Sequence, residues 1–166
     1  EVLTCLASVA VVIKYGVTIQ SVFGLVFTWL LITITFIDFA EQIIPDRIVF
    51  PLFGIGLVIG TFQVFVGPDQ AIWGSMIGFL SLWSIYIVFK IVTGKEGMGY
   101  GDFKLLMALG AWFGPLALPN IILMSAVLGL IIGLILKKAR NESKPFAFGP
   151  YLAIAGWAYL IFGNII

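Results

Sequence analysis

Long runs of apolar residues dominate the sequence, and short breaks that contain polar residues, proline or glycine separate them. A helix that crosses a bilayer needs about 20 residues, each with a rise of about 1.5 Å. The runs do not alternate in every second residue, as strands of a membrane barrel would. The pattern therefore predicts an all-α, polytopic helical membrane protein with about seven hydrophobic spans. The expected spans are approximately Val2–Tyr15, Ile19–Ile37, Ile48–Val66, Ala71–Val92, Asp102–Gly114, Leu116–Leu136 and Pro150–Ile166.

One boundary between the spans is open. The fifth run is short, and Gly114-Pro115 and then Pro119-Asn120 follow it. Because proline has no backbone N–H, these prolines either end one helix and start the next or kink a single helix. The longest polar stretch is Lys137–Lys144, which is too short for a soluble domain. We therefore expect a single membrane-embedded domain over residues 1–166.

Composition supports the membrane interpretation and excludes several chemistries. Hydrophobic residues make up 61% of the chain and charged residues 10%, whereas a soluble domain has about 25% charged residues. The sequence has no histidine, which excludes Ser-His triads and histidine-bound zinc. Cys5 is the only cysteine, so neither a disulfide framework nor a CxxC zinc site is predicted. We expect no metal site and no nucleic-acid partner.

Basic residues are distributed unevenly between the two predicted faces of the membrane. Alternating spans place Lys14, Gly67–Gln70 and Pro115–Asn120 on one face. The positive-inside rule assigns the opposite, strongly basic face to the cytoplasm. That face receives eight basic residues: Arg47, Lys90, Lys95, Lys104, Lys137, Lys138, Arg140 and Lys144.

Small residues recur four positions apart within three of the spans. This spacing lets the backbones of two helices approach closely, so it predicts helix packing rather than a ligand site. The pairs are Gly56 with Gly60, Gly74 with Gly78, and Gly129 with Gly133.

Two carboxylates need an explanation, because a charge close to the bilayer interior is costly. Asp38 follows the apolar run that ends at Ile37, and Asp102 precedes the apolar run of the fifth span. The predicted topology puts both at the cytoplasmic edge of the membrane. In the absence of histidine, two carboxyls at one depth favour an aspartic dyad that shares one proton over a water. The alternative is that Asp102 is a helix N-cap and Asp38 an ordinary interfacial residue.

Glycines surround the second carboxylate in the sequence Gly-x-Gly-Asp. Gly99 and Gly101 allow positive φ and a close approach of the backbone to a reacting peptide. Asp102 is expected to open the following helix, where the helix dipole favours the ionised form. The sequence therefore predicts Asp102 as the carboxylate and Asp38 as the acid, within a pair that titrates together.

Three further polar residues lie close to these carboxylates in the sequence. Glu41 lies three positions after the first aspartate and would share its helical face, so it is a candidate substrate contact, with a solvated loop acid as the alternative. Asp46 follows a proline and is expected to cap a helix that begins near Ile48. Lys104 supports the glycine-rich segment by pairing with Asp102 or a neighbour, or else it is an interfacial anchor.

Three stretches resemble bacterial type IV prepilin peptidases. Phe36–Leu52 (FIDFAEQIIPDRIVFPL) resembles their first catalytic segment, Gly97–Gly114 (GMGYGDFKLLMALGAWFG) their second, and Pro145–Pro150 (PFAFGP) their last loop. The likeness covers nearly the whole chain, with the same motif order and approximate spacing. A bare GxGD motif is a weak signal, but GxGDxKL preceded by D-x-x-x-x-x-x-P-D is a specific one.

The resemblance implies a GxGD aspartic endopeptidase of the bacterial inner membrane, with Asp38 and Asp102 as its catalytic pair. It implies cleavage of prepilins and pseudopilins at the cytoplasmic face, with no cofactor for proteolysis and with the lipid bilayer as a further partner. Many members also methylate the new N-terminus with S-adenosylmethionine. The long members carry another N-terminal span and a cytoplasmic segment with paired CxxC motifs, which this sequence lacks. We therefore expect a short or truncated member without that zinc-type segment, in which methyl transfer is an open question.

Two alternative functions fit the sequence less well. A presenilin-like intramembrane protease would have a Tyr-Asp first motif and a Pro-Ala-Leu motif in the last span, whereas Ile37 precedes the first aspartate here. A proton-coupled membrane transporter would place its acids at mid-bilayer, whereas these two are predicted at the membrane edge.

Overall fold

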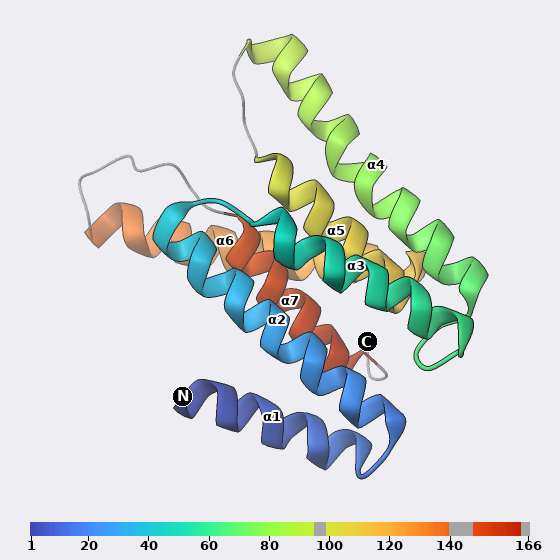
Figure 1. Cartoon of the computed structure of the whole chain (residues 1–166). Coiled ribbons are helices and arrows are strands. Elements are labelled where there is room, and N and C mark those ends of the chain that lie inside the picture. The colour runs from blue at the N-terminus through green and yellow to red at the C-terminus, as the bar shows by residue number, and fades with distance from the viewer. Residues whose placement is uncertain (95–98, 140–147, 164–166) are drawn as a thin grey trace.

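The computed structural model describes residues 1–94, 99–139 and 148–163, with the side chains of residues 135–139 outside the description. Every regular element in these ranges is helical (Figure 1), which confirms the all-α prediction. The elements are α1 (Val2–Tyr15), α2 (Ile19–Glu41), α3 (Asp46–Thr61), α4 (Pro68–Thr93), α5 (Tyr100–Phe113), the 3₁₀ turn η1 (Pro115–Ala117), α6 (Leu118–Ala139) and α7 (Gly149–Phe162).

Three helical segments within the described residues are long and apolar enough to cross a bilayer: Ile19–Glu41, Pro68–Thr93 and Pro115–Leu134. The helices α1, α5 and α7 have 14 residues each. At a rise of about 1.5 Å per residue they are shorter than a hydrocarbon core of about 30 Å. The prediction of a helical membrane protein is therefore confirmed, and that of about seven spans is supported only in part.

The second helix is longer than the sequence predicts. It continues past Ile37 to Glu41, so that Asp38 lies in its last turn rather than beyond its end. Gln42 ends the helix in the left-handed conformation, with φ 56°, and its N–H donates to the Asp38 carbonyl. The apolar run stops at Ile37, but the backbone hydrogen bonds extend the helix by one more turn.

The third helix begins at Asp46, two residues before the expected start, and ends at Thr61 instead of Val66. Its end is a Schellman motif, in which the Val64 N–H donates to the Ile59 carbonyl and the residue before Val64 adopts φ 54°. The apolar residues after the helix hide this stop signal in the sequence. They form a turn, although their composition is that of a span.

The two prolines after α5 separate two helices. Gly114, with φ 77°, ends α5, and Pro115 begins the 3₁₀ turn that leads into α6. Pro119 is the second residue of α6, where proline is tolerated because that N–H has no partner within the helix. This settles the open boundary in favour of a break.

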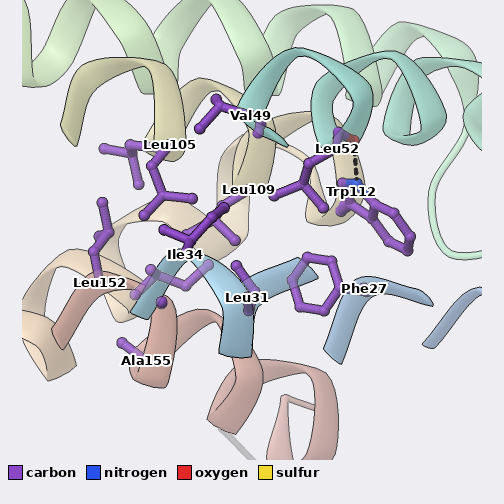
Figure 2. Close-up of a cluster of buried hydrophobic side chains, with 14 of the residues drawn as sticks. Phe27, Leu31, Ile34, Val49, Leu52, Leu105, Leu109, Trp112, Leu152 and Ala155 are labelled. Carbon is purple, nitrogen blue, oxygen red and sulfur yellow. Dashed lines mark hydrogen bonds between the residues drawn. The ribbon is translucent and has the colours of Figure 1, made fainter. Parts of the chain in front are cut away.

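Helix α5 lies at the centre of the core and is buried almost all round. A helix with apolar residues on every side is stable only when other helices cover it. Figure 2 shows α2, α3 and α7 contributing side chains around it. The core residues labelled there are Phe27, Leu31, Ile34, Val49, Leu52, Leu105, Leu109, Trp112, Leu152 and Ala155.

Glycines let α4 cross α5 at close range. A Cβ at Gly74 would collide with the Gly110 carbonyl, and one at Gly110 with the Gly74 carbonyl. A Cβ at Gly78 would lie 2.6 Å from the Leu106 carbonyl oxygen. The predicted packing role is thus confirmed for this pair of glycines.

The glycine pair of α3 has the same role. Gly56 faces the Trp112 ring, where a Cβ would lie 2.6 Å from the indole, and Gly60 faces Ala71 at 2.9 Å. The packing role of Gly129 and Gly133 stays a prediction.

Candidate active site

The two predicted catalytic carboxylates lie at the same end of the bundle. Asp38 is in the last turn of α2 and Asp102 in the first turn of α5, and these helix ends gather with the beginnings of α3 and α7 (Figure 1). Both side chains are buried, with 4% and 6% of their surface exposed. The negative charge of Asp38 acts on Asp102. The fold therefore brings together two carboxylates that the sequence places on different helices.

Asp102 is held by the first turn of α5. Gly99 is the N-cap residue, and Asp102 is the third residue of the helix, so the N-cap alternative is wrong. The carboxylate forms a hydrogen bond with the Gly99 backbone, as the acid of a capping box does. The local sequence thus both starts the helix and fixes the carboxylate at its first turn.

The ionisation of Asp102 differs from the expectation. Helix α5 is not one of the three segments of spanning length. Burial, and after it the charge of Asp38, raise the pKa of the Asp102 carboxyl to about 7, although the hydrogen bond with Gly99 lowers it. Desolvation thus opposes the helix-dipole argument that Asp102 is the ionised member. The two carboxyls form one titrating unit that holds a proton near neutrality.

Asp38 faces the first residue of α7. A Cβ built at Gly149 would collide with Oδ2 of Asp38. Within the described residues this buried oxygen has no hydrogen-bond partner. The carboxylate is thus in contact with the backbone of another helix at its N-terminal end.

Ile44, between α2 and α3, separates the helix ends that carry the site. Its side chain is 8% exposed. A Cβ at Gly101 would lie 2.7 Å from the Ile44 Cβ, and a Cβ at Gly149 would lie 2.6 Å from its Cδ1. Ile44 therefore fills a slot between the beginnings of α5 and α7.

The glycines of Gly-x-Gly-Asp act by space rather than by positive φ. Gly99 has φ −75°, and Gly101 is not among the positive-φ glycines of the described residues. Only Gly101 is crowded, since a Cβ at Gly99 would make an ordinary contact of 3.7 Å with Asp102. At Gly101 the close neighbour is Ile44, so the expected approach to a reacting peptide stays a prediction, and the expected left-handed backbone is wrong.

Lys104 pairs with Asp46 and not with Asp102. Its Nζ lies 2.7 and 2.8 Å from the two carboxylate oxygens of Asp46. Asp46 makes no side-chain cap hydrogen bond and is the first residue of α3, which corrects its expected role as a cap. The pair ties the beginning of α3 to the first turns of α5, close to the dyad.

The remaining predicted residue, Glu41, is exposed at the last position of α2, so a substrate contact stays a prediction.

Sequence reasoning assigned no role to Ile44 or Gly149. For Gly149 the signal was present, because it belongs to the stretch PFAFGP. Of that stretch Pro145–Ala147 lie outside the described residues, as do Gly97 and Met98 of the second segment.

This arrangement has the chemistry of a general acid–base pair. Two carboxyls that share a proton in a desolvated site can activate a water with one member and protonate an oxygen with the other. Their position at helix ends, and not midway along two helices, disfavours a mid-bilayer proton relay.

Comparison with known proteins agrees with this chemistry. The model of the type IV leader peptidase family matches residues 25–134, which include both aspartates. The chain is 49% identical to a prepilin leader peptidase/N-methyltransferase of Aeromonas hydrophila. It is 47% and 48% identical to proteins of that name from Pseudomonas putida and Pseudomonas aeruginosa. Each comparison covers 100% of this chain and 58% of the relative, so the chain spans little more than half their length. No solved structure matches.

Proposed function

Because the chain belongs to the type IV leader peptidase family, we propose that it is a membrane aspartic endopeptidase that removes the leader peptide of type IV prepilins and pseudopilins. The observation that carries the proposal is the buried pair of Asp38 and Asp102 at one end of the bundle. The names of its relatives give the substrate class.

In the proposed reaction the two carboxyls hold one proton and a water between them. The ionised carboxyl takes a proton from the water as its oxygen attacks the scissile carbonyl, and the protonated carboxyl donates its proton to the carbonyl oxygen. The tetrahedral intermediate then collapses: the C–N bond breaks, the leaving nitrogen takes the proton of one carboxyl, and a hydroxyl of the intermediate gives its proton to the other carboxyl as the new C=O bond forms. The pair thus ends with one proton, as it began. Burial of both carboxyls strengthens these interactions, because the local dielectric constant is low.

A second proposed activity is methylation of the new N-terminus, which the relatives' names favour. S-adenosylmethionine would supply the methyl group, and the new terminal amine would accept it. None of the described side chains identifies a place for this donor, so no residue is assigned to the transfer.

The cleavage test uses the purified chain in detergent with a prepilin and measures product mass. We expect a product shortened by the leader peptide. When S-adenosylmethionine is added and the transfer occurs, this product is expected to be heavier by one methyl group. Metal chelators are expected to leave cleavage intact, since the proposed mechanism uses two carboxyls. An uncleaved prepilin, or cleavage that chelation stops and zinc restores, would contradict the proposal.

The proposed location is the bacterial inner membrane, with the site at the cytoplasmic face. Arg47, Lys90 and Lys104 lie on helix ends or first turns at the end of the bundle that holds the dyad. Asp69 is in the first turn of α4, at the opposite end of that helix from Lys90. The basic positions Lys95, Lys137, Lys138, Arg140 and Lys144 support the same orientation from the sequence, and their side chains lie outside the described residues.

Cysteine labelling tests this orientation. Cys5 is exposed, so the cysteines are introduced into a Cys5→Ser background. Lys95→Cys and Arg140→Cys are expected to react only from the cytoplasm, and Asp69→Cys only from outside, because basic loops are retained inside. Labelling of positions 69 and 140 from the same side would overturn the proposed topology.

A further inference from the structure

Gly149 lies where a side chain would displace one of the two catalytic carboxyls. It is the first residue of α7, a helix of 14 residues. A Cβ at this position would collide with Oδ2 of Asp38 and would lie 2.6 Å from Cδ1 of Ile44. The Gly149 hydrogen that occupies the place of a Cβ therefore points at the Asp38 carboxylate.

The backbone does not require glycine at this position. Gly149 begins a helix and is not among the positive-φ glycines of the described residues. Pro150 follows, and its ring would crowd a Cβ on a helical residue before it, so this neighbour also favours glycine. The closest atom that a Cβ would meet is nevertheless Oδ2 of Asp38, so the missing side chain leaves room mainly for the Asp38 carboxyl.

Burial leaves this carboxyl little room to move. Oδ2 of Asp38 has no hydrogen-bond partner among the described residues, although Asp38 is 96% buried, being 4% exposed. Ile44 packs against Gly149 and Gly101 at once. The spacing between the beginnings of α5 and α7 is thus set by one side chain held between two glycines.

We propose that Gly149 is a positioning residue of the dyad, because its bare α-carbon forms the seat that holds the Asp38 carboxyl against Asp102. The weak C–H donor and the positive end of the α7 dipole face the carboxylate at this seat. Ile44 fixes the distance of the seat from α5. The inference rests on the proposed function for its catalytic consequence, but the geometry can be tested without a substrate.

The test compares Gly149→Ala with Gly54→Ala, a control in α3 where a Cβ would meet nothing within 4 Å. Gly149→Ala is expected to lower kcat/KM for prepilin cleavage about 100-fold, since a displacement of about 1 Å at a reacting group has an effect of that order. The control is expected to cleave like the original chain. The thermal unfolding midpoints of both variants in detergent show whether they are folded.

The decisive measurement is a pH titration of the aspartate carboxyl carbons by ¹³C NMR, assigned with Asp38→Asn and Asp102→Asn. Coupling between the two carboxyls separates their titration steps, so displacing Asp38 relative to Asp102 is expected to change the separation of the steps in Gly149→Ala. The other ionisable side chains on these helix ends are Glu41, Asp46, Arg47, Tyr100, Lys104 and Tyr151, and the substitution leaves all of them in place.

If Gly149→Ala does not fold, the double variant with Ile44→Ala replaces it, because that change removes the contact with Cδ1 and leaves the contact with Asp38. Unchanged titration steps in a folded variant would overturn the inference, whether or not activity is lost. A loss of activity with unchanged steps would indicate a purely structural role for Gly149. Failure of the proposed function has a different result, namely that the original chain does not cleave or that Asp102→Asn does.

Discussion

Asp38→Asn and Asp102→Asn are each expected to abolish prepilin cleavage while the protein still inserts and folds. An amide cannot take up or share the proton that the proposed reaction moves, and both carboxyls are needed for the water to be activated and the carbonyl oxygen protonated. Loss of either member of a catalytic unit removes the function of the other. The measurement is prepilin cleavage by each purified variant at matched protein concentration.

The double variant is expected to be no less active than either single one. Groups that act as a unit have strongly non-additive effects. Glu41→Gln and Asp46→Asn are the matched controls, because they change carboxylates at the same end of the bundle to which no proton transfer is assigned. Both controls are expected to keep measurable activity. Robust turnover by Asp102→Asn would end the aspartic mechanism.

Asp102→Glu separates a chemical role from a structural one. It keeps the charge and the helix start but moves the carboxyl by about one methylene, away from the position that the hydrogen bond with Gly99 fixes. We expect a folded and severely impaired enzyme, because misplacement of a reacting group by about 1 Å can lower the rate about 100-fold. Normal activity would show that the position of this carboxyl is not critical.

The pH dependence follows from the burial of Asp102. Its pKa is raised from 3.8 to about 7, so the pair keeps a proton at pH values at which an exposed aspartate has lost it. Cleavage needs that proton, and kcat/KM is therefore expected to fall as the pH rises through about 7. The free energy of unfolding is expected to change in the same direction. The folded chain binds this proton more tightly than the unfolded chain, so the stability that the proton contributes decreases as the pH rises from 3.8 to about 7. A flat profile between pH 5 and 9 would contradict the shared proton.

Trp112→Ala is expected to destabilise the protein by about 3–5 kcal/mol, the range for removing a large buried aromatic side chain. Trp112 is fully buried in α5. Its ring centroid lies 4.6 Å from that of Phe27, and its indole N–H donates to the Leu52 carbonyl at 2.8 Å (Figure 2). Truncation leaves a cavity between three helices and removes this hydrogen bond. Reversible unfolding in detergent measures the effect.

Two control variants separate the effect of losing the hydrogen bond from the effect of losing a buried ring. Trp112→Phe keeps most of the ring but removes the donor, so it is expected to cost about 0.5–1.5 kcal/mol for the lost hydrogen bond to the Leu52 carbonyl, which keeps its partner within α3. Trp83→Ala changes a tryptophan of α4 that is 39% exposed, and its effect is expected to be smaller than either. Equal stability of Trp112→Ala and Trp83→Ala would show that α5 is not the centre of the core.

The sequence by itself determined the helical membrane class and singled out the two aspartates that the fold brings to one end of the bundle. The apolar runs are a property of consecutive residues, and a carboxylate at the edge of such a run is conspicuous because a buried charge is costly wherever the chain folds. The prolines near residue 115 marked either a break or a kink, since proline removes a backbone donor in any context, and the structure decided for a break. Local chemistry was sufficient for the class and for singling out the aspartates.

Only the tertiary structure decided how the site is held. Lys104 could be assigned several partners from sequence, and the crossing of α3 with α5 selects Asp46. Gly149 gains its meaning from the Asp38 carboxyl and Ile44, which lie more than 100 positions earlier in the chain. Burial likewise raises the pKa of Asp102, whereas its place in the helix suggested the opposite. Such contacts and desolvation depend on where the helices cross, and the spacing of residues in the sequence does not show where that is.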